Sequence, residues 1–373
     1  MPGFPLTPNP EPVLIPDWIA HDTPLLPRAR RIPLLGRGSD PGPLRPRVAH
    51  WMQVLQEHLT EFFEEADGGG RFREDVWNRP GGGTGVSRVL SEGRTFEKAG
   101  VNRYTGGGPI ARAEAERLGA RSLPPGEIRF FATGVSVVCH PRSPMVPIVH
   151  MNVRYFELEG PDGERLDHWF GGGLDLTPTH PFPEDAVHFH RTLKAVCDSW
   201  GASLYPGFKD WCDDYFVNRH RDGELRGVGG IFFDNLRPEV DGPMEAEELL
   251  SFVRDVGFSL PPAYGPLVEA RRDTPWGARE KELQMLRRGR YVEFNLVHDR
   301  GTRFGLLTNA RIESVLMSMP PLARWEYDVT YEPGSFESRL QAMLRPHDWA
   351  SGIPSALAEE SHEHIQRSEG AQP

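Results

Sequence analysis

Two runs of β-forming residues, 128–140 and 146–158, lie next to each other in the sequence and restrict what this chain can fold into. Both are rich in Val, Ile, Phe and Tyr, which favour strands. The residues between them, 140–145, include Pro141 and Pro144 and are typical of a turn. Strands with so short a connection pair antiparallel. The sequence therefore predicts an antiparallel hairpin over these two runs.

Helices and further strands are predicted on both sides of this hairpin. Residues 48–66 repeat apolar side chains at i, i+3, i+4 and i+7, as an amphipathic helix does. No dinucleotide-binding glycine motif and no P-loop motif joins a strand to a helix. We predict an α+β fold with a large antiparallel β-sheet. The other predicted helices are 183–200, 206–220, 243–257, 262–272 and 275–288, and the other predicted strands are 226–234, 290–298 and 303–308.

Composition divides the chain into three regions. Residues 1–46 contain twelve prolines and no periodicity, which predicts an irregular extension. Residues 47–350 mix the helix and strand periods, and we expect them to form a single domain. Residues 351–373 are polar, which predicts a frayed C-terminal tail.

The charge of the chain argues against some classes of partner. It has 53 acidic and 42 basic residues, which gives a net charge of −11, and only four of the basic residues are lysine. The acidic balance argues against binding to nucleic acid or to an anionic membrane. No run of about 18 apolar residues occurs, so we expect no stable membrane insertion.

The three cysteines, Cys139, Cys197 and Cys212, contain no Cys-x-x-Cys pair and are odd in number. A disulfide framework is therefore not expected, and a reducing cytoplasm fits. The N-terminus lacks a basic segment followed by an apolar segment, so no secretory signal is predicted. We expect a cytoplasmic protein.

The predicted hairpin has one face of unusual chemistry, because side chains alternate between the two faces of a strand. A solvent-exposed face is the simpler explanation. A surface strand would more often contain Lys, Glu and Thr, whereas these residues can form hydrogen bonds and titrate. The face consists of Ser136, Val138 and His140 on the first strand and His150, Asn152 and Arg154 on the second.

Two predicted helices each place a histidine on their apolar side. His190 is in line with Leu193 and Cys197, and His220 is in line with Cys212 and Phe216. Both histidines are therefore predicted to face inward. For each one alone, a buried histidine with its hydrogen bonds satisfied is a commoner explanation than a ligand.

Two further segments contain candidate functional residues. The three consecutive glycines in 169–178 permit close backbone approach. A flexible lid and a platform for a flat ligand are functional explanations, and a plain turn is the simpler one. Asp299-Arg300-Gly301 follows a predicted strand and is also typical of a turn. In a cavity, Asp299 can accept N–H bonds or act as a base, and Arg300 and Arg311 can bind carboxylates.

Several long blocks resemble oxygen-dependent coproporphyrinogen III oxidases, and the resemblance runs from about residue 48 to about residue 349. The blocks are His-Met-Asn-Val-Arg (150–154), Trp-Phe-Gly-Gly-Gly-Leu-Asp-Leu-Thr-Pro (169–178), Arg-Gly-Val-Gly-Gly-Ile-Phe-Phe-Asp (226–234), Arg-Tyr-Val-Glu-Phe-Asn-Leu (290–296), Asp-Arg-Gly-Thr (299–302), Met-Ser-Met-Pro-Pro-Leu (317–322) and Arg-Trp-Glu-Tyr (324–327).

The resemblance implies an enzyme that oxidatively decarboxylates two propionates of coproporphyrinogen III to vinyl groups, giving protoporphyrinogen IX in heme biosynthesis. Molecular oxygen would be the electron acceptor, and no flavin, heme or nicotinamide would be needed. The implied fold is a large, flat antiparallel sheet with helices on both faces, in a single domain. The implied assembly is a homodimer whose interface includes residues 291–326.

The resemblance also implies roles for individual residues. His150 corresponds to the proposed proton donor, and residues 309–311 correspond to a substrate-binding segment. That segment is Asn309-Ala310-Arg311 where the family usually has Gly-Gly-Arg, and His298 stands where the family commonly has an aromatic residue. Further substrate-binding positions are Ser136, Asn152, Val153 and Arg154. Positions that correspond to divalent-metal ligands in the family are His140, His150, His190 and His220.

The residue inventory agrees with a substrate that has four carboxylates, which Arg154, Arg300 and Arg311 can bind. Asp299 can accept hydrogen bonds from the pyrrole N–H groups and remove one proton, so that the electron-rich ring reacts with oxygen. His150, Asp299 and Arg300 are therefore the predicted catalytic residues. Two other classes stay open: a histidine-ligated metal-dependent oxygenase or hydrolase that acts on another carboxylate, and a non-catalytic tetrapyrrole-binding protein.

Overall fold

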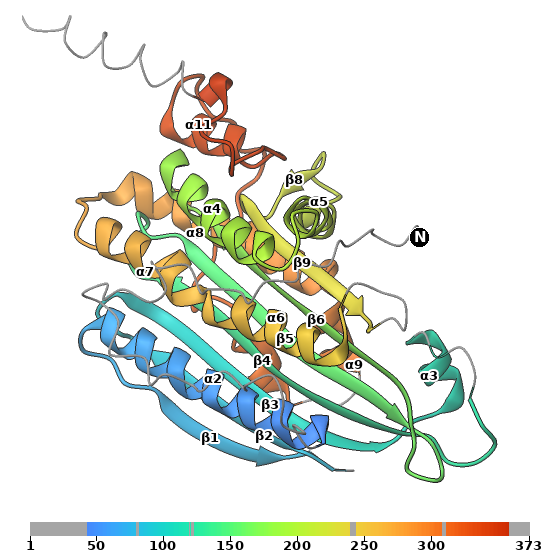
Figure 1. Ribbon diagram of the computed structural model, residues 1–373. Coiled ribbons are helices and arrows are strands. Elements are labelled where there is room, and N and C mark those ends of the chain that lie inside the picture. Colours follow the sequence, from blue (N-terminus) through green and yellow to red (C-terminus); the bar gives the residue numbers. More distant parts are fainter. Residues whose placement is uncertain are drawn as a thin grey trace, which may run out of the picture.

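A single antiparallel sheet of seven strands dominates the part of the chain that the computed structural model describes, residues 43–79, 82–118, 120, 123–238, 244–307 and 311–357 (Figure 1). The sheet has the order β1-β2-β3-β4-β5-β6-β9. Its strands are β1 (Arg73–Asn78), β2 (Thr84–Ser91), β3 (Phe96–Pro109), β4 (Arg129–Pro141), β5 (Ile148–Glu159), β6 (Arg165–Thr177) and β9 (Gly229–Leu236). The predicted hairpin is confirmed, because β4 pairs antiparallel with β5 from Arg129↔Glu159 to Cys139↔Val149.

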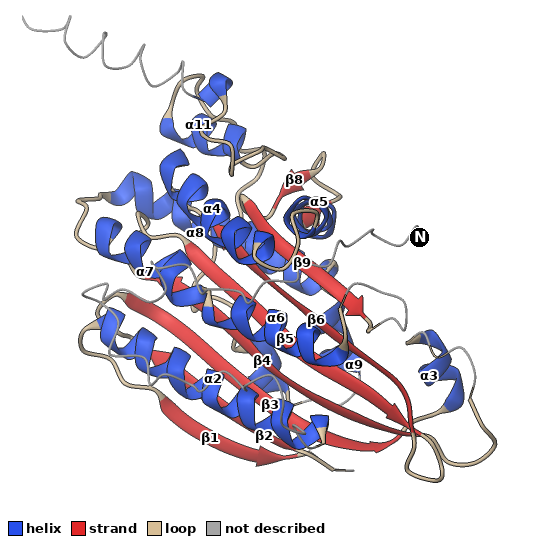
Figure 2. Ribbon diagram, viewed as in Figure 1, coloured by secondary structure: helices blue, strands red, loops and turns tan. Residues whose placement is uncertain are grey.

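Helices lie on both faces of this sheet (Figure 2). Apolar side chains of α2, α4, α6 and α7 share one core with the sheet. On the other face, Tyr291 of α8 packs on Val138 and Ile148, and Ser314 of α10 lies against Ser87 of β2. The predicted α+β fold is therefore confirmed. These helices are α2 (Leu44–Asp67), α4 (Pro183–Asp198), α6 (Ala246–Phe258), α7 (Leu260–Arg271), α8 (Ala278–Val297) and α10 (Ile312–Leu316).

Smaller elements complete the described structure. The helix α9 follows directly after α8, and α5 lies in the chain between α4 and the short β7–β8 hairpin. The bounds are α3 (Arg112–Arg117), α5 (Leu204–Tyr215), β7 (Val217–Asn218), β8 (Glu224–Leu225), α9 (Arg300–Leu307) and α11 (Phe336–Met343). No helix among the described residues is both long and apolar enough to cross a membrane.

The two faces of the central strands differ as the alternation predicts. One face is apolar and fully buried in the main core, and it consists of Val135, Val137, Cys139, Met151, Val153 and Tyr155. The opposite face, which we call the polar face, is only half-buried at most of its central positions. The polar face consists of Ser136, His150, Asn152, Arg154 and Asp175.

Several predicted elements are wrong. Within the predicted strands 290–298 and 303–308, residues 290–297 are helical and belong to α8, and residues 303–307 are helical and belong to α9. Tyr291 and Phe294 are three residues apart, as on one side of a helix, and both are buried. Leu296 and Val297 are apolar but exposed, and they extend the segment into an apolar run that resembles a strand. The predicted helix 206–220 ends at Tyr215.

The glycine-rich block 169–178 is neither a turn nor a lid, because most of it is the interior of strand β6. Glycine disfavours strands intrinsically, so composition gave no signal for one here. Strands β1, β2 and β3 were not predicted either. The predicted N-terminal extension falls outside the described residues up to position 42, and α2 already begins at Leu44. Most of the predicted C-terminal tail, residues 358–373, also lies outside them.

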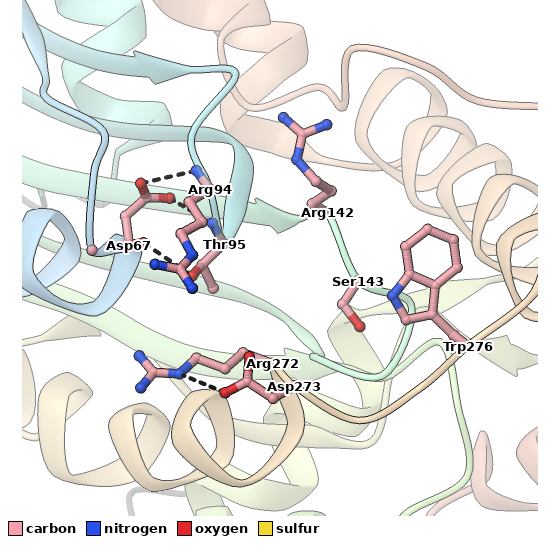
Figure 3. A pocket seen from close by; sticks show the side chains of 9 residues that line it. Asp67, Arg94, Thr95, Arg142, Ser143, Arg272, Asp273 and Trp276 are labelled. Atoms are coloured by element: carbon pink, nitrogen blue, oxygen red, sulfur yellow. Dashed lines mark hydrogen bonds and ion pairs between the residues drawn. The ribbon is translucent and has the colours of Figure 1, made fainter.

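A buried carboxylate connects the end of α2 to the turn between β2 and β3 (Figure 3). Asp67 Oδ1 accepts from the backbone N–H of Thr95 (2.9 Å) and Phe96 (2.8 Å), and Oδ2 accepts from Gly70 (2.6 Å) and Arg94 (3.0 Å). Burial by itself raises the pKa of this carboxyl, but the four N–H bonds outweigh it, and the pKa lies below its ordinary value.

We predict that Asp67→Ala lowers the free energy of unfolding by about 3 kcal/mol at pH 7, because it leaves backbone N–H groups without acceptors. The pKa is lower in the folded state, so this contribution is complete above the unfolded pKa of about 4 and is lost as pH falls through the folded value. Urea denaturation at pH 7 and at acid pH measures both effects. Asp273→Ala removes an exposed carboxylate that lines the same surface cavity as Asp67 (Figure 3) and should change stability by less than about 0.5 kcal/mol. Equal losses in the two variants would contradict the assignment.

Candidate active site

The polar face brings together residues that lie far apart in the sequence. In the sheet, Asn152 of β5 stands between Ser136 of β4 and Gly173 of β6. Arg154 stands two residues further along, beside Gly171. A Cβ at Gly171 would come within 2.8 Å of Arg154 Nε, so glycine here leaves the space in which the Arg154 side chain lies. The glycine-rich strand is thus part of the site.

His150 is held by a buried ion pair. Its Nδ1 is 2.7 Å from Asp175 Oδ1, and Asp175 also forms an ion pair with Arg226 (Nη2 to Oδ1, 2.6 Å). The Arg226 guanidinium lies over the rings of Phe216 (4.2 Å) and Tyr291 (4.6 Å). Asp175 and Arg226 are 3% and 2% exposed, so the pair is dry.

The charges of this group determine which nitrogen of His150 has the proton. Burial raises the pKa of Asp175, but Arg226 and then His150 oppose it, and the pKa of the carboxyl lies below its ordinary value. An ionised carboxylate only accepts, so His150 Nδ1 donates to Asp175. His150 Nε2 has no protein partner among the described residues, and the side chain is 21% exposed. The histidine is therefore oriented with one nitrogen free for proton transfer.

Two of the predicted arginines converge at the β9 side of the polar face. Arg154 Nη1 donates to Asn152 Oδ1 (2.5 Å), and Nη2 forms an ion pair with Asp234 Oδ1 (2.8 Å). Arg300 at the start of α9 approaches the second oxygen of Asp234 (3.7 Å). This arrangement brings three predicted site residues together around one carboxylate.

Asp299 lies between α8 and α9 and not at the end of a strand, as the sequence had suggested. Its Oδ1 accepts from the Tyr215 hydroxyl (2.9 Å), and its Oδ2 accepts from the backbone N–H of Thr302 (2.6 Å). The Tyr215 hydroxyl in turn accepts from the backbone N–H of Arg300 (3.1 Å). The carboxylate therefore fixes the start of α9 and the position of Arg300.

The remaining predicted substrate-binding residues lie apart from this group. Arg311 forms an ion pair with Asp75 of β1, at the opposite edge of the sheet from β9. The side chain of Val153 is buried in the core on the other face, so only its backbone faces the strands beside it. Asn309 and Ala310 lie outside the described residues.

The four predicted metal-ligating histidines do not form a cluster. His140 Nε2 is 2.8 Å from the carbonyl of Ser318, and burial lowers the pKa of His140 to about 3. His190 is also fully buried, with Nε2 bonded to the Val228 carbonyl (2.9 Å) and Nδ1 to the Tyr205 hydroxyl (2.9 Å), and burial lowers its pKa to about 3. Its predicted inward orientation is confirmed, in the form of a satisfied core histidine.

His220 lies beyond the end of α5 and is exposed, so its predicted inward orientation is wrong. It contacts His298 (Nδ1 to Nε2, 2.8 Å). His140 Nδ1 is a buried atom without a hydrogen-bond partner among the described residues. Among the described residues, no three His, Cys, Asp or Glu side chains are placed to hold a metal ion. The residues present therefore do not fit the implied metal.

A cavity of about 360 Å³ lies away from the polar face, next to the turn between β4 and β5 (Figure 3). None of the predicted site residues lines it. Most of its charged side chains already have partners, since Asp67 accepts backbone N–H bonds, Arg142 donates to the Gly93 carbonyl (3.0 Å) and Arg272 pairs with Asp273 (3.5 Å). This cavity shows no sign of belonging to the site.

Three site residues were missed by sequence reasoning, although all lie in blocks that carry the resemblance: Asp175, Arg226 and Asp234. Asp175 had a signal, because it is two and four residues from Gly173 and Gly171 and therefore shares their face of the strand. Arg226 and Asp234 had none, because their partners come from other elements.

We predict that Arg226→Met lowers the free energy of unfolding by about 3–5 kcal/mol, because it leaves the Asp175 carboxylate buried without its cation. Urea denaturation at neutral pH measures the change. The control is Arg237→Met, which breaks the more exposed ion pair with Asp167 and should cost about 1 kcal/mol or less. Losses of the same size in both variants would show that the buried Arg226 pair contributes no more to the free energy of unfolding than an exposed pair does.

Comparisons with known proteins show the family of this chain. The family model of coproporphyrinogen III oxidase matches residues 47–349. The oxygen-dependent coproporphyrinogen-III oxidase, chloroplastic, of Glycine max is 49% identical over 314 residues, which is 82% of this chain and 80% of the relative. The protein of the same name from Nicotiana tabacum is 49% identical over 318 residues (83% and 79%). Coproporphyrinogen-III oxidase 1, chloroplastic, of Arabidopsis thaliana is 48% identical over 312 residues (82% and 79%). The chain belongs to the coproporphyrinogen III oxidase family.

Proposed function

We propose that this protein oxidatively decarboxylates two propionates of coproporphyrinogen III to vinyl groups, with molecular oxygen as electron acceptor, and so forms protoporphyrinogen IX for heme biosynthesis. For each propionate, the substrate loses carbon dioxide and a hydride equivalent, and oxygen leaves as hydrogen peroxide. The observation that carries the proposal is the combination, on one sheet face, of the oriented His150 and the two arginines that converge on Asp234.

The charge of the site supports a substrate with several carboxylates. Arg154 and Arg300 lie near one edge of the sheet, and Arg311 pairs with Asp75 at the other. Arginine stays ionised and binds carboxylates through paired N–H groups. Five strands, β2 to β6, separate the two edges, so Arg154 and Arg300 are the two arginines placed to bind carboxylates of the substrate together.

The proposed chemistry assigns one role to each predicted catalytic group. Asp299 accepts a pyrrole N–H hydrogen bond through a lone pair that Tyr215 and Thr302 leave free, and it helps to remove that proton. The electron-rich ring then reacts with oxygen, and the resulting peroxide takes a hydrogen from the propionate β-carbon as carbon dioxide leaves. His150 supplies or removes a proton through Nε2, and Arg300 binds the propionate. None of these steps needs a metal ion.

One assay separates this function from the two other classes. Anaerobic and aerobic incubations with coproporphyrinogen III are compared, and products are read by fluorescence after oxidation. Product that forms only with oxygen, and also after chelation, is the expected result. A metal-dependent oxygenase would lose activity on chelation. A non-catalytic tetrapyrrole-binding protein would bind the substrate without consuming oxygen.

We predict that His150→Gln lowers kcat roughly 10²–10⁴-fold, because a side-chain amide cannot transfer the proton. The control is His188→Gln on α4, where the ring is bonded to the Pro262 carbonyl away from the polar face, and its kcat should stay within about twofold of wild type. Oxygen uptake with coproporphyrinogen III gives both rates. A wild-type rate in His150→Gln would eliminate a role for His150 in proton transfer.

We further propose a homodimer whose interface includes residues 291–326. Eight of the eleven exposed large apolar side chains among the described residues fall within 296–327, and exposed apolar clusters of this kind mark interfaces. These eight side chains are Leu296, Val297, Leu306, Ile312, Leu316, Leu322, Trp325 and Tyr327.

We predict that Leu322→Asp shifts the protein from dimer to monomer, because it places a charge on an apolar contact that is 61% exposed in the single chain. Sedimentation velocity across a concentration series measures the shift. Trp276→Asp replaces an exposed apolar residue outside 296–327 and should leave the mass unchanged. An unchanged dimer in Leu322→Asp would place the interface elsewhere.

We propose a reducing compartment, with the cytoplasm as the expected one. All three cysteines are buried and free, which supports this assignment. The plant relatives are named as chloroplastic.

A further inference from the structure

A bulge in β9 shapes the position of Asp234. Phe170 of β6 pairs with Leu236 and Gly172 pairs with Phe233, so Asp234 and Asn235 together stand opposite the single residue Gly171. Asn235 has φ +51°, a left-handed conformation that asparagine tolerates well. Its backbone N–H donates to Asp234 Oδ1 (3.0 Å). Bulges of this kind reorient a side chain next to a functional site.

The Asp234 carboxylate connects two arginines from different elements. Arg154 of β5 reaches its Oδ1, and Arg300 of α9 approaches its Oδ2. The side chain of Asp234 is 14% exposed, whereas those of Arg154 and Arg300 are 30% and 61% exposed. The carboxylate thus lies beneath the two guanidinium groups, which remain open to a ligand.

Aromatic rings support both guanidinium groups. Arg154 lies over Trp169 (5.9 Å), and Arg300 lies over Tyr215 (5.0 Å). A guanidinium has five N–H groups, and the contacts to Asn152 and Asp234 use only some of those on Arg154. Two cations and one anion leave a net charge of +1, which one propionate neutralises.

We propose that Asp234 is a positioning residue that aligns Arg154 and Arg300 so that both bind a single propionate of the substrate. This inference rests on the proposed function and deepens it. Without the carboxylate, two like charges from separate elements repel each other and no longer share an orientation. With it, they form one preorganised binding group.

The sign of the effect distinguishes positioning from simple electrostatics. Asp234→Asn keeps the size of the side chain and removes its negative charge. If Asp234 acted only through its charge, the variant would bind the tetracarboxylate substrate more tightly, because the local positive charge increases. If Asp234 aligns the arginines, the variant binds more weakly despite the added positive charge.

The test measures coproporphyrinogen III binding without oxygen and turnover with oxygen. For Asp234→Asn we expect the anaerobic Kd and the KM to rise roughly tenfold or more, with kcat within about threefold. In Arg300→Gln/Asp234→Asn, we expect Kd to stay close to that of Arg300→Gln alone, because the two changes disrupt the same group. The matched control is Asp167→Asn, which breaks the ion pair with Arg237 just past the Phe170–Leu236 end of the β6–β9 pair and should leave Kd unchanged.

Each outcome has one meaning. A lower or unchanged Kd in Asp234→Asn would overturn the positioning role, as would full additivity in the double variant. Equal effects of Asp234→Asn and Asp167→Asn would reduce Asp234 to a structural residue. If the wild-type protein itself neither binds nor converts coproporphyrinogen III, the proposed function fails instead, and the role of Asp234 falls with it.

Discussion

The ion pair between Arg226 and Asp175 is the interaction on which the site depends. It connects β6 to the segment before β9 and, through Asn295 (2.9 Å from Arg226 Nη1), to α8. Aromatic rings from α8 and from the end of α5 enclose the guanidinium, so water cannot replace either partner. Because a buried charge without a partner is costly, these elements can only pack together with the pair in place. The orientation of His150 follows from this packing.

The two faces of the sheet differ in chemistry, so that one face forms the core and the other holds the site. The apolar face joins α2, α4, α6 and α7 in one core and provides most of the buried area. The polar face holds its side chains on extended strands, whose backbone is fixed by pairing on both sides. Groups on such a support keep their spacing, which suits a reaction whose proposed partners are arranged around a flat ring.

Local patterns in the sequence predicted what depends on local geometry. The alternation along β4 and β5 placed Ser136, His150, Asn152 and Arg154 on one face, because a strand has a period of two. Asp299 and Arg300 were recognised as candidates, but the segment before them was predicted as a strand and is a helix. Its buried residues Tyr291 and Phe294 are covered by residues that are distant in the sequence. Short apolar runs do not distinguish a helix from a strand without those contacts.

Long-range contacts explain the rest of the differences. The partners of His190 are Tyr205 and Val228, which lie far from it in the sequence. The sequence therefore favoured a satisfied core histidine for His190 taken alone but left a ligand open. The sequence did not identify Asp234, because its role depends on a bulge in β9 and on two arginines that are 80 and 66 residues away in the chain. The resemblance to the family identified the matching sequence segments but not the contacts between them.

The order of strands has a consequence for how the protein assembles its site. Strands β1 to β6 pair with their sequence neighbours, so they can form by successive closure of short loops. The last strand, β9, pairs with β6 across residues 178–228, the longest connection between paired strands of the sheet. The contacts of Asp234 therefore depend on the pairing whose loop closure costs the most entropy. A nascent or damaged chain that has not closed this edge would present His150 and Arg154 without Asp234, and so would lack the complete site.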